Sequence, residues 1–162
     1  MSHASNSLSK NAQIVQNALC QKGLEFKVVE LSASTRTANE AAATIGCQVG
    51  QIIKSILFTT QDNHKPILVL ASGVNRVNEK MIEKEIGLKI IKADAEFTKN
   101  ITGFPIGGVP PVGHKQIIDT YIDEDLLRFE ELWAAAGTPN AVFRLQSADL
   151  IKLTDGKIVS IK

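Results

Sequence analysis

The sequence has few aromatic residues, only two cysteines and almost no charge bias. Aromatic side chains make up 5% of the 162 residues, so the core must be mainly aliphatic. Two cysteines, Cys20 and Cys47, do not suggest a disulfide scaffold in a chain of this length. We predict that both are reduced and structural, as small buried side chains. The formal net charge of +1 argues against a protein that wraps nucleic acid by bulk electrostatics.

Long apolar runs are also absent, and so are the common catalytic motifs. No apolar segment is long enough to cross a bilayer, and residues 1–10 do not resemble a secretory signal. We therefore expect a cytoplasmic protein without membrane contacts, in which residues 1–7 form a flexible tail. The sequence has no P-loop, GxGxxG or GxSxG motif, and His3, His64 and His114 lie far apart. We accordingly expect no metal and no cofactor.

Composition and patterning predict one globular domain spanning residues 1–162. The hydrophobic fraction of 44% and the charged fraction of 22% are typical of a folded protein. Apolar residues at helical spacing alternate with short β-branched segments from end to end. Several strands follow one another as hairpins, which favours a strongly twisted, mixed, barrel-like sheet flanked by short helices. This is an α/β fold of the α+β type.

The individual elements are predicted from capping residues, stop signals and apolar periodicity. Helices are expected at 8–22, at 37–46 behind a Thr37–Glu40 capping box, at 79–86, at 95–97 and for one turn after a capping Ser147. Strands are expected at 25–31, 53–60, 66–71, 88–91, 117–122, 141–145 and 157–161. Residues 131–136 are ambiguous, because their alanines favour a helix whereas the segment is short.

The segment 103–113 is rich in glycine and proline over a longer stretch than a tight turn requires. Glycine lets the backbone approach a ligand closely, and proline stiffens a loop. The free amides of such a loop can converge on a carbonyl oxygen, an oxyanion or a phosphate. The donors left by the prolines are the amides of Gly107, Gly108, Val109 and residues 112–114. A simple connection between strands is the alternative, and composition leaves both open.

Lys54 is the second feature that points to chemistry. In a strand it shares the more apolar face with Ile52 and Ile56, where an unpaired ammonium is costly. Either it reaches from the start of the strand into water, which the pattern favours, or it points into a cleft that requires a positive charge. The other lysines alternate with acidic residues, as on a solvated surface, and include Lys80, Lys84, Lys89, Lys92 and Lys99.

Four segments, at residues 36–42, 51–58, 107–114 and 137–143, occur together in an order that resembles one known family. This is the YbaK and prolyl-tRNA synthetase-associated editing domain family of aminoacyl-tRNA deacylases, and the likeness extends from about residue 34 to residue 162. The resemblance implies a mixed, barrel-like sheet with flanking helices, no metal and no covalent intermediate. It also implies that residues 131–136 form a strand.

The resemblance implies a free-standing enzyme that hydrolyses the ester of a wrong amino acid on tRNA. Its expected partners are the acceptor end of aminoacyl-tRNA and, in some arrangements, a tRNA synthetase. The expected catalytic residues are Lys54, Gly107, Gly108, Val109 and Pro111. The expected substrate-binding residues are Thr37, Gly73, Gly113, His114, Thr138 and Asn140. The turn around Thr138 and Asn140 is expected at the amino-acid pocket.

Two departures from the family pattern bear on the loop. Many members have serine or threonine where this chain has Val109 or Pro110, and glutamine is frequent at the position of His114. The resemblance therefore points to the backbone of the loop, not to its side chains. Two alternatives stay open: a non-catalytic homologue that binds tRNA or a synthetase, and a hydrolase of another small ester or nucleotide.

Overall fold

A computed structural model describes residues 8–162, so the tail predicted at residues 1–7 and His3 lie outside the described residues. The α-helices are α1 (Lys10–Gln21), α2 (Ala38–Ile45), α3 (Glu79–Ile86), α4 (Ala95–Thr102) and α5 (Ser147–Thr154). The strands are β1 (Val28–Glu30), β2 (Ile52–Thr60), β3 (Pro66–Ser72), β4 (Ile90–Lys92), β5 (Asp119–Asp123), β6 (Glu131–Ala135), β7 (Ala141–Gln146) and β8 (Lys157–Val159). Two short 3₁₀ helices are η2 (Val49–Gln51) and η3 (Glu124–Arg128).

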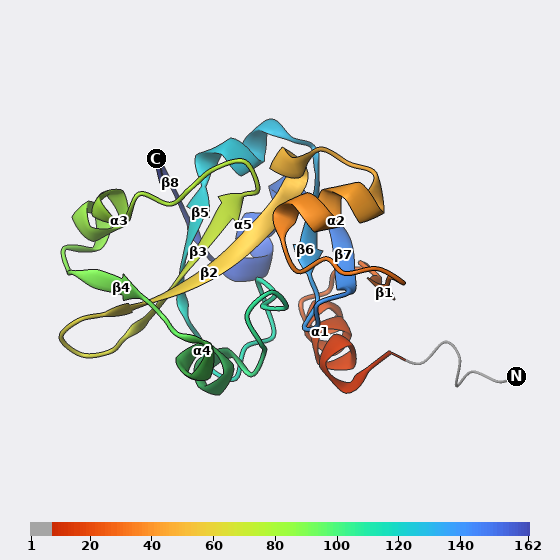
Figure 1. The fold of residues 1–162 in the computed structure, drawn as a ribbon, viewed down its shortest axis with the longest axis horizontal. Helices are drawn as coiled ribbons and strands as arrows, with labels where there is room; N and C mark the ends of the chain where they lie inside the picture. The colour runs from red at the N-terminus through yellow and green to blue at the C-terminus, as the bar shows by residue number, and fades with distance from the viewer. Residues whose placement is uncertain (1–7) are drawn as a thin grey trace, which may run out of the picture.

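The eight strands form one mixed sheet, which confirms the predicted α+β class (Figure 1). Seven strands follow the order β1-β7-β6-β2-β3-β5-β8, and β4 pairs with β2 beside this path. The central pair is the predicted β2–β3 hairpin, which is antiparallel, and β6 and β5 flank it as parallel neighbours. In Figure 1, β2 crosses the front of the molecule and α5 lies behind it.

Helix ends follow the sequence signals closely. The Thr37 hydroxyl accepts from the Glu40 N–H and the Glu40 carboxylate accepts from the Thr37 N–H, so the predicted capping box begins α2. Gly46 ends this helix with a φ of 86°, in the left-handed region that suits glycine. Asn78 and Asp94 cap α3 and α4 through their side chains, as predicted.

Several predicted boundaries are wrong. Helix α4 continues to Thr102, well beyond Phe97, because the added residues bury Thr98 and Thr102 and pack Ile101 against the core. Ser147 is the first residue of a two-turn α5 and does not cap it. Strand β5 starts at Asp119, where pairing with β3 begins, and Ile117 is 97% exposed in the preceding loop. The ambiguous segment 131–136 contains strand β6, as the family resemblance implied.

The outer strands are shorter than their sequence patterns. Of residues 25–31 only Val28–Glu30 pair with β7, and of residues 157–161 only Lys157–Val159 pair with β5. The strand expected at residues 88–91 pairs with β2 only over Ile90–Lys92. At sheet edges the extent of pairing is decided by the single neighbouring strand, which local patterning does not reveal.

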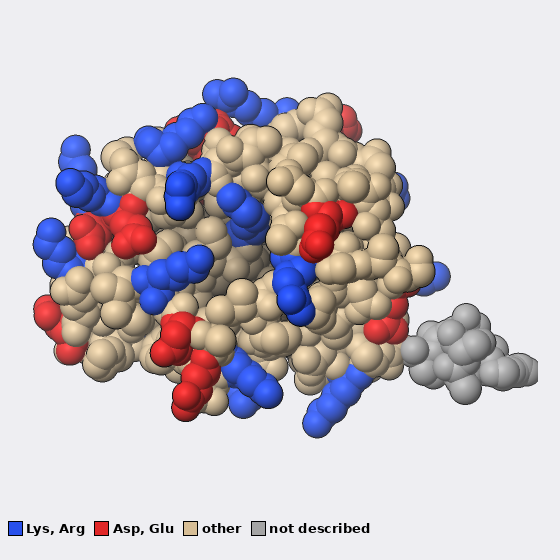
Figure 2. Space-filling view, in the orientation of Figure 1, with Lys and Arg blue, Asp and Glu red and all other residues tan. Residues whose placement is uncertain are grey.

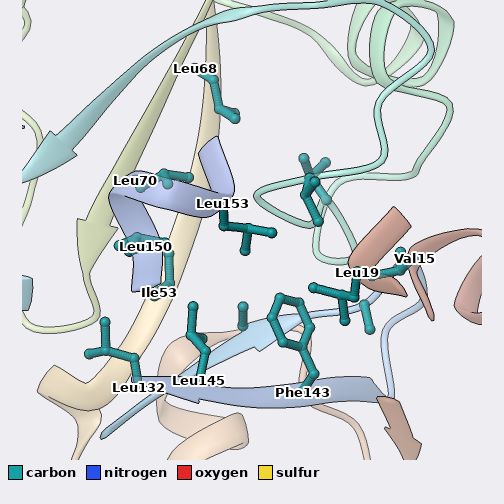
Figure 3. Packing of buried hydrophobic residues seen from close by; sticks show 14 of the residues in the cluster. Val15, Leu19, Ile53, Leu68, Leu70, Leu132, Phe143, Leu145, Leu150 and Leu153 are labelled. Carbon is teal, nitrogen blue, oxygen red and sulfur yellow. The ribbon is translucent and has the colours of Figure 1, made fainter. Parts of the chain in front are cut away.

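The core is mainly aliphatic, as the composition predicted. Leu150 and Leu153 of α5 lie beside Phe143 and Leu145 of β7 and Leu19 of α1 (Figure 3). The prediction that both cysteines are buried is wrong for Cys20, which is exposed on α1, and Cys47 is half-buried. No helix within residues 8–162 is both long and apolar enough to cross a membrane.

Candidate active site

A cavity of about 420 Å³ opens where β2 lacks a neighbour on one edge. β2 pairs with β6 only at Ile52 and Ile53, and with β4 only over its last three residues. Between these points, residues 54–56 pair with β3 alone. The cavity reaches through this gap to Ala93 and Val109, so a gap in the sheet creates the space for a ligand.

Four cationic side chains line the cavity, and within residues 8–162 no aspartate or glutamate does. They come from four separate segments and are Arg36, Lys54, Arg76 and Lys92. Figure 2 shows lysine and arginine side chains gathered around a hollow on the face where β2 lies in front. A cavity lined by several cations and by no carboxylate favours an anionic ligand, because none of the lining residues repels it.

The remaining wall of the cavity is largely apolar. It is lined by residues of α2, β2, β6 and β7, including Ala41, Ile45, Ile52, Ile56, Trp133, Ala135 and Val142. The volume lies within the range of small-molecule sites, which combine apolar walls with a few polar groups. The site therefore suits a ligand with an anionic part and a small apolar part.

Lys54 is half-buried, lines this cavity, and donates a hydrogen bond from its ammonium to the backbone carbonyl of Asn75. Burial lowers the pKa of Lys54, the carboxylate of Asp123 opposes this effect, and Arg76 and Lys92 lower the pKa further. Of the two placements that the sequence leaves open, the structure puts Lys54 in the wall of a cleft. Such a partly desolvated ammonium interacts more strongly with an anion than a fully hydrated one does.

The loop predicted to bind substrate approaches the cavity through Gly107 and Val109. Gly107 has a φ of 89°, and its backbone lies against the side chain of Arg36. Within the described residues, the N–H groups of Gly107 and Val109 donate no hydrogen bond. Gly108 differs from the expectation, because its N–H already donates to Pro105 O at 2.9 Å. Its amide is therefore not free for a ligand.

Comparison with known proteins now identifies the family. Residues 32–153 match the model of the aminoacyl-tRNA editing domain. The chain belongs to this family.

Solved and curated relatives resemble this chain over most of its length. A crystal structure of a candidate trans-editing enzyme for prolyl-tRNA synthetase is 46% identical, with a TM-score of 0.91, over 96% of this chain and 99% of that one. The uncharacterised protein YwhH of Bacillus subtilis is 29% identical over 89% of this chain and 91% of its own length. EbsC of Enterococcus faecalis, a candidate Cys-tRNA(Pro)/Cys-tRNA(Cys) deacylase, is 26% identical over 77% of this chain and 76% of its own.

The second half of the glycine- and proline-rich loop, at residues 111–114, does not line this cavity. Pro111, Gly113 and His114 line a separate hollow of about 270 Å³, together with Lys22 at the end of α1. The Nε2–H of His114 donates to Pro110 O at 2.7 Å, and burial lowers the pKa of this histidine. The structure therefore does not bring these three residues together with Lys54.

Among the other expected substrate-binding residues, Thr37 lines the cavity, although its hydroxyl caps α2. Gly73 lies against η2, where an added Cβ would be 2.2 Å from Val49 O, so packing explains this glycine.

Thr138 and Asn140 do not line the cavity. The Thr138 hydroxyl donates to Asn140 Oδ1 at 3.0 Å, and Asn140 Nδ2 donates to Leu31 O at 2.9 Å. Both side chains thus stabilise the turn between β6 and β7. The structure does not bring them together with Lys54.

Sequence reasoning misses three of the four cations at the rim. The sequence pattern groups Lys92 with the solvated lysines, yet its side chain lines the cavity, whereas Lys80, Lys84, Lys89 and Lys99 do not. Arg36 lies shortly before α2, and Arg76 lies shortly after β3. In such connecting segments the sequence pattern does not show where a side chain points. Only the three-dimensional arrangement brings these side chains to one opening.

Proposed function

We propose that this protein hydrolyses the ester that joins an amino acid to the 3′ end of tRNA. The observation that carries the proposal is the pairing of a cationic rim with a small apolar wall in one cavity. The end of a charged tRNA has the matching chemistry, because a phosphodiester strand ends there in an amino acid. The candidate functions named for the similar crystal structure and for EbsC support the same assignment.

An aminoacyl ester is already activated, so the reaction needs positioning and charge stabilisation more than a strong nucleophile. Water adds through its oxygen to the ester carbonyl carbon, and the N–H groups of Gly107 and Val109 bind the oxyanion. The ribose oxygen then leaves with one proton of the water, and the other proton passes to solvent as the carboxylate forms. The backbone of the loop acts here, as expected from its lack of hydroxyl side chains.

Lys54 binds a phosphate or ribose oxygen of the terminal adenosine in this proposal. Its ammonium has one hydrogen bond to Asn75 O, which leaves two N–H groups for a ligand. Arg36, Arg76 and Lys92 attract the phosphates of the single-stranded end toward the opening. The apolar wall around Trp133 receives the amino-acid side chain. We further propose that residues 1–162 form one domain that acts in the cytoplasm, with or without a synthetase partner.

A panel of mischarged tRNAs tests the proposal. Each is incubated with the protein, and the release of labelled amino acid is followed against spontaneous hydrolysis. We expect release from at least one tRNA bearing a small amino acid. Tight binding of the same tRNAs without release would favour a binding module, and release from simple esters but not from tRNA would favour a small-ester hydrolase.

A further inference from the structure

Asn75 connects the lysine of the site to two carboxylates. It is 8% exposed and follows β3, where its N–H donates to Ser72 O at 2.9 Å. Its side-chain amide donates to Asp123 Oδ2 and to Asp125 Oδ2, both at 2.8 Å. Its backbone carbonyl accepts the hydrogen bond from the Lys54 ammonium. One buried residue therefore joins groups from β2, β5 and η3.

The two carboxylates are themselves fixed. Asp123 is 1% exposed and accepts from the N–H groups of Ser72 and Asp125, each at 2.9 Å. Asp125 pairs with Lys162 at 2.8 Å and with Arg128 at 3.3 Å. The hydrogen bonds from Lys162 and Asn75 hold the pKa of Asp125 below its usual range. Asp125 is thus a carboxylate at neutral pH, and its hydrogen bond with Asn75 is charge-assisted.

A lysine side chain has four rotatable bonds, and holding its ammonium in one place costs conformational entropy. Here the cost is offset by a hydrogen bond to the carbonyl of a residue that is held in place, because the Asn75 side-chain amide donates to two buried carboxylates. The β2–β3 hairpin pairs through its own backbone, and the N–H of Ser72 at the end of β3 connects it to Asp123. The network ends at the cavity, at the Lys54 ammonium.

We propose that Asn75 is the positioning residue for Lys54, with Asp123 and Asp125 holding its amide so that its carbonyl fixes the ammonium at the rim of the cavity. This inference rests on the proposed function only where deacylation is the readout. The position of the ammonium itself is independent of any substrate.

The charged groups near Lys54 come from four different segments. Asp123 lies on β5, Arg76 follows β3, Lys92 lies on β4 and Arg36 precedes α2. In Asn75→Ala the carbonyl loses its support and the ammonium gains freedom to approach water and the carboxylates. Burial is the largest cause of the lowered pKa of Lys54, so release into water outweighs the lost hydrogen bond to the carbonyl, and the pKa rises toward its ordinary value.

The first experiment measures this directly. Lysine labelled with ¹³C is titrated by NMR in the wild type and in Asn75→Ala, and the Lys54 Cε signal is assigned by its disappearance in Lys54→Arg. Asn78→Ala is the matched control, since it removes an asparagine that caps α3 and reduces stability without touching Lys54. We expect the titration of Lys54 to move upward in Asn75→Ala and to stay in place in Asn78→Ala. An unchanged Lys54 titration in a folded Asn75→Ala protein would overturn the inference.

The second experiment is a double-mutant cycle on deacylation. We expect Asn75→Ala to lower kcat by roughly tenfold or more, as for removal of a charge-assisted hydrogen bond. The double variant Lys54→Ala/Asn75→Ala should be no slower than Lys54→Ala alone, because Asn75 acts through the lysine. Additive effects would contradict positioning and indicate a general effect on folding. If Lys54→Ala retained full turnover, the proposed function of the lysine would fail, and the NMR titration would still decide the role of Asn75.

Discussion

The N–H of Gly137 donates to the carbonyl of Gly108 at 2.8 Å, which joins the substrate loop to the turn between β6 and β7. The approach is close: a Cβ on residue 108 would lie 3.0 Å from the carbonyl carbon of Gly137 and from the N of Thr138. Both neighbouring atoms belong to the backbone, so they cannot easily move aside. Packing therefore explains the glycine at position 108, for which the family resemblance implies a catalytic role.

Gly108→Ala should destabilise the protein. Overpacking of this kind costs about 1–3 kcal/mol, so the Tm should fall by several degrees, and activity should fall with it as the loop shifts. Thermal melts of the variant and the wild type measure the effect. A variant with wild-type Tm and no remaining activity would indicate instead that this residue contacts the substrate.

The apolar wall of the cavity should set the choice of amino acid. Ala135→Val adds two methyl groups to a β6 residue that lines the cavity, and it should change the ratio of kcat/KM between a small and a larger amino acid. One or two methyl groups change discrimination by about 1–3 kcal/mol. Thr138→Val is the control, because Thr138 lies outside the lining and should leave the ranking unchanged. A changed ranking in Thr138→Val alone would place the pocket at the β6–β7 turn.

The cations at the rim should govern affinity for the RNA strand. Arg76→Ala and Lys92→Ala should each weaken binding of aminoacyl-tRNA and reduce the dependence of log K on log salt by about 0.7 for each phosphate that is no longer neutralised. Lys84→Ala removes the same charge from α3, outside the cavity, and should change neither quantity. Binding titrations at several salt concentrations give the slopes. Equal effects from all three variants would mean that net charge alone matters.

His114 should make stability depend on pH. Burial lowers its pKa in the folded protein, so the unfolded chain binds the proton more readily. Stability therefore decreases as the pH falls below about 6.5, the ordinary histidine value, toward the lowered folded value. His114→Gln keeps a donor for Pro110 O and should flatten this part of the Tm profile between about pH 7.5 and about pH 5. A profile of unchanged slope in the variant would assign the effect to another group.

The starts and ends of helices are the part of the fold that the sequence predicts best. The capping box at Thr37 begins α2, and Gly46 and Gly87 end their helices in the left-handed region, because these signals depend on a few adjacent residues. Residues 131–136 show the limit. Alanine favours a helix, and only pairing with β7 and β2 makes this segment a strand, which is expected from family resemblance alone.

The sequence predicts only part of the candidate site. Lys54 stands out in the sequence because an apolar strand face is an unfavourable place for a charge, and the loop stands out because its composition exceeds what a turn needs. Asn75, Asp123 and Arg76 carry no such signal, since a polar residue near a strand end is ordinary in sequence. Their significance arises from contacts between distant segments, as between Asn75 and Asp123.

The most direct test of the proposed function is the rate of amino-acid release from one mischarged tRNA by the wild type, Lys54→Ala and Lys84→Ala, with thermal melts on the same preparations. We expect Lys54→Ala to keep its Tm or to gain slightly, since a partly desolvated charge is removed. Its release rate should fall by about 10–100-fold, the value of a charge-assisted hydrogen bond of roughly 1.5–3 kcal/mol, while Lys84→Ala matches the wild type. A folded Lys54→Ala protein that releases the amino acid at the wild-type rate would contradict the assignment of this cavity as the active site.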